Sequence, residues 1–138
     1  MRLWFVIVAT LLVACDSAEK QDAASVLEAI HRFRTAENDA LPNMVEQLKA
    51  TPCKFDDSCH AKQVCAALGD DTAKALRLKN EVELGLNAVE KGTLAKDSPE
   101  ALSFEKKLDD AAALLKKGHD GLPECDAAVE SLKRKYRL

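Results

Sequence analysis

Apolar residues recur at spacings of three and four through most of the chain, which is the pattern of amphipathic helices. These stripes predict helices at about 22–37, 42–49, 58–91, 99–117 and 122–136. No stretch combines alternating polarity with β-branched enrichment, so we expect no sheet. The pattern therefore predicts an all-α fold, a small bundle of about five helices. The residues expected to face inward in the second half of the chain are Ala75, Leu78, Val82, Leu86, Val89, Ala101, Phe104, Leu108, Ala111, Ala112, Leu115, Cys125, Val129, Leu132 and Tyr136.

The boundaries of the long third stripe are marked by glycines and by residues that cap helices. Asp57 or Ser58 is suited to cap its start, because a short polar side chain can accept a hydrogen bond from a free amide of the first turn. We expect Gly69 to bend or interrupt this helix, with Asp71 capping the continuation. Gly92 is expected to end it.

The last two helices have strong start signals. Ser98, Pro99 and Glu100 place a capping hydroxyl, a proline and an acid in the order typical of a helix start. Gly118 is expected to close that helix. The final helix is expected to begin at 122–124, where Pro123 again suits a first turn.

The first fifteen residues differ from the rest of the chain. Arg2 precedes a largely apolar run of 12 residues, from Leu3 to Ala14. A positive end followed by a short apolar stretch is the layout of a secretory signal, and the run is shorter than the roughly 20 residues of a membrane-spanning helix. Its end, Leu12-Val13-Ala14-Cys15, resembles the lipobox of bacterial lipoproteins.

The resemblance implies an address. In that family the signal is cut before the cysteine, so residues 1–14 would be a signal peptide and Cys15 would carry the lipid. Residues 15–22 would then be the lipidated cysteine and a short tether, and 23–138 a helical domain held against the bacterial cell membrane and facing the periplasm. Asp16 matches an inner-membrane retention signal of several Gram-negative bacteria, and the outer membrane is the alternative.

Composition argues against several classes of function. Without the signal, 19 Lys and Arg face 23 Asp and Glu, a net charge of −4, and four aromatic residues remain. A mildly acidic chain with few aromatics has neither the basic footprint nor the stacking platform of a nucleic-acid binder. We therefore expect no nucleic-acid partner.

Four cysteines remain beside Cys15, and in an oxidising compartment an even number favours two disulfides. Short connections make neighbouring helices antiparallel, so the helix at 99–117 should bring Cys125 back to the level of Cys65. Cys59 lies roughly 120° from Cys65 around the helix, so the two do not share the inward face. This favours Cys65–Cys125 with Cys53–Cys59. The rival pairing is Cys53–Cys65 with Cys59–Cys125.

Chemistry has few candidate residues. His60, Cys59 and Cys65 give a weak alternative metal site, but they lack a Cys-x2-Cys element and the expected compartment favours oxidised thiols. No histidine lies in a nucleophile motif. We expect neither a cofactor nor catalysis.

A basic cluster closes the chain, formed by Lys133, Arg134, Lys135 and Arg137. It suits anionic lipid head groups or an acidic partner, and equally a solvated helix end whose cations complement the dipole. Together these features predict a lipid-anchored, non-catalytic helical module that binds another envelope protein. The alternatives are a ligand- or metal-binding or sensing lipoprotein of the periplasm that uses the Cys53–Cys65 segment and His60, and a small envelope enzyme without a recognisable motif.

Overall fold

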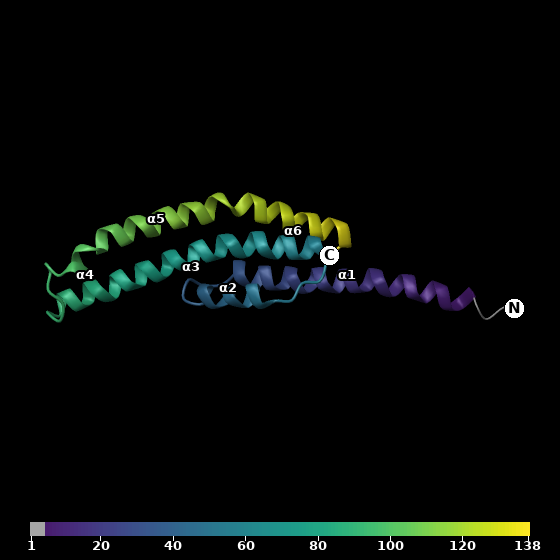
Figure 1. The fold of residues 1–138 in the computed structure, drawn as a ribbon, viewed down its shortest axis with the longest axis horizontal. Helices are drawn as coiled ribbons and strands as arrows, with labels where there is room; N and C mark the ends of the chain where they lie inside the picture. Colours follow the sequence, from purple (N-terminus) through teal and green to yellow (C-terminus); the bar gives the residue numbers. More distant parts are fainter. Residues whose placement is uncertain (1–4) are drawn as a thin grey trace.

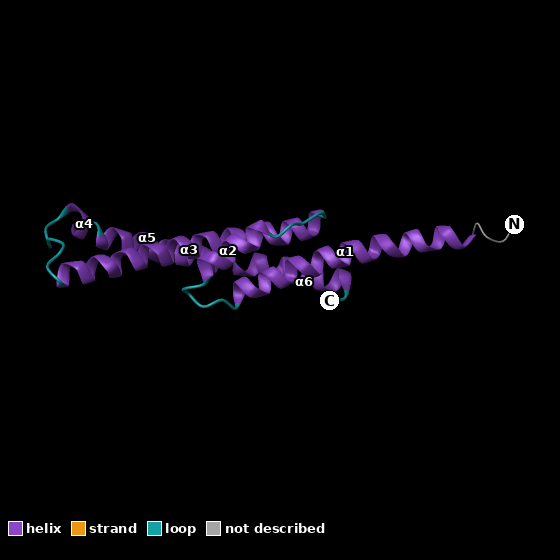
Figure 2. Ribbon diagram, turned by 90° about the horizontal axis from the view of Figure 1, so that it is seen from below, coloured by secondary structure: helices purple, strands orange, loops and turns teal. Residues whose placement is uncertain are grey.

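A computed structural model of the chain describes the backbone of residues 5–138 and the side chains from Ala18 onward. The predicted all-α fold is confirmed: the described residues form helices joined by turns and loops, and they contain no strand (Figure 2). The helices are α1 (Phe5–Arg34), α2 (Leu41–Ala50), α3 (Asp56–Glu90), α4 (Pro99–Leu102), α5 (Phe104–Asp120) and α6 (Leu122–Tyr136).

Helix α3 is the element that the others pack against. Helices α1, α2 and α6 surround its N-terminal half, whereas α5 pairs with its C-terminal half (Figure 1). In the described part of the chain α5 contacts neither α1 nor α2. The molecule therefore consists of a four-helix base and a two-helix projection, residues 75–117, which we call the arm. The tip of the arm lies at the end opposite the N-terminus (Figure 1).

The base holds the continuous hydrophobic core. The predicted inward stripes of α1, α2 and α6 are buried there, and the residues at its centre are Val26, Ile30, Val45, Leu48, Cys65 and Cys125. The arm has a narrower seam, made mainly by Ala75, Val82 and Gly85 on α3 and by Phe104 and Ala111 on α5. A Cβ on Gly85 would lie 2.2 Å from Cζ of Phe104. The absence of a side chain at Gly85 thus lets the aromatic ring pack directly on the α3 backbone.

Two glycines have packing roles that the sequence did not indicate. Gly69 does not interrupt α3, and the helix continues through Asp71 without a new start. A Cβ on Gly69 would lie 2.9 Å from Cγ2 of Val45, so the glycine allows α2 to approach closely. Gly118 does not close α5, which continues to Asp120. A Cβ on Gly118 would lie 2.6 Å from Oγ1 of Thr72, so the glycine leaves room for the threonine side chain. Both glycines are therefore packing residues inside helices.

Several helix boundaries follow the sequence and others do not. Ser98 caps α4 by accepting a hydrogen bond from the Ala101 amide, and Gly92 adopts a left-handed φ of +73° after α3, both as predicted. The helix expected at 99–117 is divided at Ser103 into α4 and α5. Neither Asp57 nor Ser58 is the N-cap of α3, because the helix begins at Asp56 with Phe55 as its N-cap.

The expected tether is helical where the structure describes it. Helix α1 begins well before Asp22, so residues 18–22 continue the helix, and it ends at Arg34. Asp22 is half-buried and accepts hydrogen bonds from the Lys54 amide at 3.1 Å. These residues belong to the folded domain.

Candidate functional site

Both favoured disulfides are present. Cys53 pairs with Cys59 at a Cα–Cα distance of 5.2 Å, and Cys65 pairs with Cys125 at 4.9 Å. The first closes a short connection between α2 and α3, which we call the knuckle. The second lies fully buried in the base and joins α3 to α6. The rival pairing is therefore wrong.

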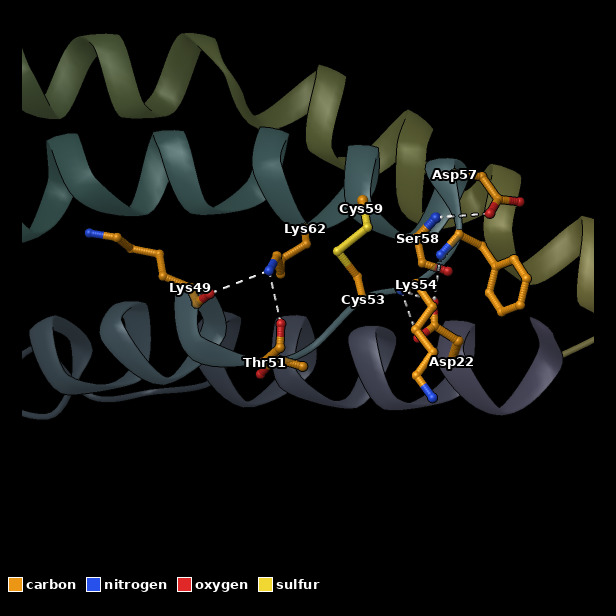
Figure 3. Close-up of a disulfide and its surroundings, with 10 residues drawn as sticks. Asp22, Lys49, Thr51, Cys53, Lys54, Asp57, Ser58, Cys59 and Lys62 are labelled. Atoms are coloured by element: carbon orange, nitrogen blue, oxygen red, sulfur yellow. Dashed lines mark hydrogen bonds between the residues drawn. A yellow bond between two sulfur atoms is a disulfide. The ribbon is translucent and has the colours of Figure 1, made fainter. Parts of the chain in front are cut away.

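The knuckle is held from both sides (Figure 3). Lys62 donates from Nζ to the carbonyls of Thr51 at 2.9 Å and Lys49 at 3.3 Å, which satisfies acceptors at the C-terminal end of α2. On the other side the Asp22 carboxylate accepts from the Lys54 and Phe55 amides, next to the positive start of α3. This network and the disulfide fix the segment as a structural staple.

The alternative metal site lacks its ligands. Cys59 and Cys65 belong to two different disulfides, so neither offers a thiolate. Among the described residues no group of three His, Cys, Asp or Glu side chains is placed to hold a metal ion. His60 is exposed and lies on a groove beside Val64 and Lys117. In the disulfide-bonded protein, Cys59 and Cys65 are therefore not available as thiolate ligands beside His60.

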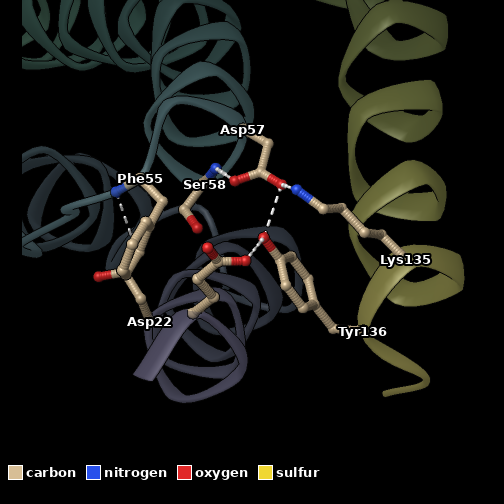
Figure 4. Close-up of polar contacts among 7 residues, drawn as sticks. Asp22, Phe55, Asp57, Ser58, Lys135 and Tyr136 are labelled. Atoms are coloured by element: carbon tan, nitrogen blue, oxygen red, sulfur yellow. Dashed lines mark hydrogen bonds and ion pairs between the residues drawn. The ribbon is translucent and has the colours of Figure 1, made fainter. Parts of the chain in front are cut away.

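The basic end of α6 packs against acids (Figure 4). Lys135 lies 2.7 Å from Oδ2 of Asp57, and the Tyr136 hydroxyl lies 2.8 Å from the same oxygen. Partial burial works to raise the pKa of Asp57, but hydrogen bonds from Lys135, Tyr136 and the Ser58 amide outweigh it, so this pKa lies below its ordinary value. Burial raises the pKa of Tyr136.

The other cations of the cluster are more exposed. Lys133 lies 3.3 Å from Glu130, and Arg137 takes a left-handed conformation, with a φ of +54°, after the end of α6. Arg134 is exposed. The cluster is thus partly neutralised by neighbouring acids, and Lys135 is the member that joins α6 to α3 through its ion pair with Asp57.

Tyr136 also fixes where α6 ends relative to α1. Its hydroxyl lies 3.3 Å from Oε2 of Glu19, so α1, the start of α3 and the end of α6 meet at one point. Glu19 is four residues after Cys15 in the sequence. The residues on which the lipoprotein prediction rests, Arg2 and 12–15, lie outside the side chains that the structure describes. The N-terminal end of the base is therefore also the end at which α3 begins.

The arm carries a feature that the sequence analysis missed. Among the described side chains, five of the six large apolar residues that are exposed belong to it: Leu84, Leu86, Leu102, Leu108 and Leu115. The stripe pattern placed Leu86, Leu108, Ala112 and Leu115 inside, but Leu86 is 53% exposed and Leu108 is 44% exposed. The pattern correctly indicated helices with a broad apolar face, and a two-helix arm covers only the centre of that face.

A groove separates α1 from α6 in the base. It has a volume of about 630 Å³ and an apolar floor that includes Leu27, Ile30 and Val129. His31, Arg34 and Lys133 stand on its rim. No sequence signal pointed to it, because it depends on how two helices distant in sequence diverge.

Comparisons with protein-family models, with curated proteins and with solved structures find no match to this chain. None of the described helices has the combination of length and apolar character needed to cross a membrane. The fold and its surfaces are therefore the basis for the function proposed below.

Proposed function

We propose that this chain is a membrane-anchored envelope lipoprotein whose domain is a non-catalytic interaction module, and that its arm binds another envelope protein. The observation that carries the proposal is the gathering of exposed leucines on the arm. Large apolar side chains exposed together on one element are typical of an interaction site. Among the described side chains of the base, the large apolar ones are buried or partly buried, with Leu138 as the exception.

The geometry supports a role at a distance from the membrane. Helix α3 has 35 residues, which at about 1.5 Å per residue gives a length of about 50 Å. It starts beside Glu19, four residues from the proposed lipid at Cys15, and it ends at the tip of the arm. An anchored molecule standing on this end would present the arm up to about 50 Å from the bilayer surface.

Anchoring supplies the affinity that a modest surface lacks. Two proteins confined to one membrane meet at an effective concentration far above that of free molecules. A small apolar surface that includes exposed side chains such as Leu86 and Leu108 is then enough for a specific complex. The proposed partner is accordingly a protein of the same membrane with an apolar surface at the height of the arm.

The two disulfides agree with the proposed compartment. Disulfides persist in the periplasm and outside the cell, whereas cytosolic thiols stay reduced. Cys65–Cys125 is buried and joins two helices of the base. In a reducing compartment this bond would not form, and the base would lose a main source of its stability. This supports a location beyond the cytoplasm, and the lipobox-like residues supply the anchor.

The test is site-specific photocross-linking in the native membrane. A photoreactive amino acid at Leu86 or Leu108 should give one discrete cross-linked product, and at Leu138, an equally exposed leucine of the base, it should give none. Cys15→Ala should release the protein from the membrane and abolish the product. The double variant Leu86→Ser with Leu108→Ser should fold, because both side chains are about half exposed, and it should lose the native complex.

Two results would contradict the proposal. Cross-links of equal yield from Leu138 and from the arm would show that the arm is not the binding element. Membrane association and lipid labelling that are unchanged in the Cys15→Ala variant would show that Cys15 does not carry a lipid anchor.

A further inference from the structure

The groove between α1 and α6 is bounded by contacts that join the two helices. On one side Tyr136 reaches Glu19, and on the other Arg34 forms an ion pair with Asp126. The lining of α1 extends from Ala24 to Thr35, which corresponds to about 16 Å along the helix. The groove is thus an elongated trough that is part of the folded base.

The trough is lined by two kinds of residue. Its floor is apolar and is formed by Ala24, Leu27, Ile30, Val129 and Leu138. The rim carries Glu28, His31, Arg34 and Lys133, of which Glu28 is paired with Arg32 on its own helix. An occupant therefore meets an apolar strip beside three nitrogen-bearing side chains, of which Arg34 is paired with Asp126 and Lys133 is paired with Glu130.

We propose that this trough binds a single-chain amphiphile with an anionic head, a long-chain fatty acid. A volume of about 630 Å³ falls within the range of small-ligand sites, which are mostly apolar with a few polar groups and often lie between the helices of bundles. The acyl chain lies along Leu27, Ile30 and Val129. The carboxylate lies at the rim, where Lys133 donates a hydrogen bond to it and Arg34 can donate from the N–H groups that its pair with Asp126 leaves over.

Lys133 is the better of the two donors. Its present partner is Glu130, at 3.3 Å in an exposed pair, and such surface pairs are weak. When a fatty acid binds, Lys133 exchanges the Glu130 carboxylate for that of the ligand. The acyl chain of the ligand also gains contact with the apolar floor of the trough. The inference goes beyond the proposed function and does not depend on the arm.

The experiment is isothermal titration calorimetry of the delipidated full chain with saturated fatty acids kept below their micelle concentrations. We expect saturable 1:1 binding. The Kd should fall about two- to fourfold with each added methylene, until the acyl chain is as long as the trough, and then stay constant. The alcohol of the same chain length should bind about tenfold more weakly, because it cannot form the charged contact.

A matched pair of variants separates the groove from general surface charge. Lys133→Glu should weaken binding of the fatty acid about tenfold. Arg134→Glu makes the same change of charge one residue along α6, outside the lining, and should change the Kd less than twofold. Equal losses in the two variants, an affinity that ignores chain length, or an alcohol that binds as tightly as the acid would each overturn the inference.

Discussion

The two disulfides should contribute unequally to stability, and the difference can be calculated from the chain. Cys65–Cys125 joins residues 60 apart, whereas Cys53–Cys59 joins residues six apart. A cross-link lowers the entropy of the unfolded chain more when it closes a longer loop. Replacing Cys65 and Cys125 together by alanine should therefore cost more free energy of unfolding than replacing Cys53 and Cys59.

The loop-entropy relation gives about 4 kcal/mol for the 60-residue loop and about 2 kcal/mol for the six-residue loop. Cys65 and Cys125 are also fully buried, so removal of their sulfur atoms leaves a void that adds to the loss. The expected difference between the two double variants is at least about 2 kcal/mol. Total stabilities of small domains are only about 5–15 kcal/mol, so the variant without the long-loop bond should be marginal.

Urea unfolding followed by circular dichroism at 222 nm measures both losses. The variant without Cys65–Cys125 should also show a larger m-value, since its unfolded chain is less constrained and exposes more surface. Equal losses, or a larger loss for the Cys53 and Cys59 variant, would refute the reasoning. That result would mean that native contacts of the knuckle outweigh the entropy of the long loop.

Three further predictions test single side chains. Gly85→Ala should destabilise the arm, because the added Cβ would lie 2.2 Å from Cζ of Phe104. The resulting overpacking costs about 1–3 kcal/mol, which outweighs the gain of about 1 kcal/mol in helix propensity. In a Phe104→Ala background the same substitution should instead stabilise the protein by about 1 kcal/mol, and urea titrations of the double-mutant cycle measure both effects. Asp57→Asn should lower the free energy of unfolding at neutral pH. Because the pKa of Asp57 is depressed in the folded state, the stabilisation by its carboxylate is present above about pH 4 and is lost as the pH falls through the pKa of the folded protein. Wild type and variant should therefore converge in stability in acid unfolding curves. Ser58→Ala should raise the thermal midpoint, with a gain of about 1 kcal/mol, because the buried Ser58 hydroxyl has no hydrogen-bond partner among the described residues; an unchanged or lower midpoint would indicate a partner for it.

The features that depend on helix geometry could be predicted from the sequence. The pairing of Cys65 with Cys125 followed from antiparallel connections and the rise per residue, both of which are local properties of helices. The helix start at Ser98 and Pro99 was likewise correct, whereas the side-chain caps expected at Asp57 or Ser58 and at Asp71 were not.

The errors concern residues whose role is set by a neighbour distant in sequence. A glycine that ends a helix and a glycine that admits another helix look alike in sequence, and only the approach of Val45 or Thr72 distinguishes Gly69 and Gly118. Leu108 and Leu86 lie on apolar stripes as predicted, but in the described part of the chain no further helix packs over them, so both are about half exposed. The exposed flanks of the arm and the groove between α1 and α6 are places where helices do not pack against each other. A pattern of apolar positions along the chain does not indicate where such gaps occur.

The buried bond between Cys65 and Cys125 also has a consequence for the order of folding. The loop it closes contains the whole arm, so the two thiols meet only after α3 and α5 have paired and returned the chain to the base. Helix pairing takes microseconds to milliseconds, whereas disulfide formation takes seconds to hours. The arm is therefore assembled first and locked afterwards. Until Cys125 arrives, Cys65 has only Cys53 and Cys59 as neighbours in the chain, and early closure of the knuckle removes both of these competing thiols.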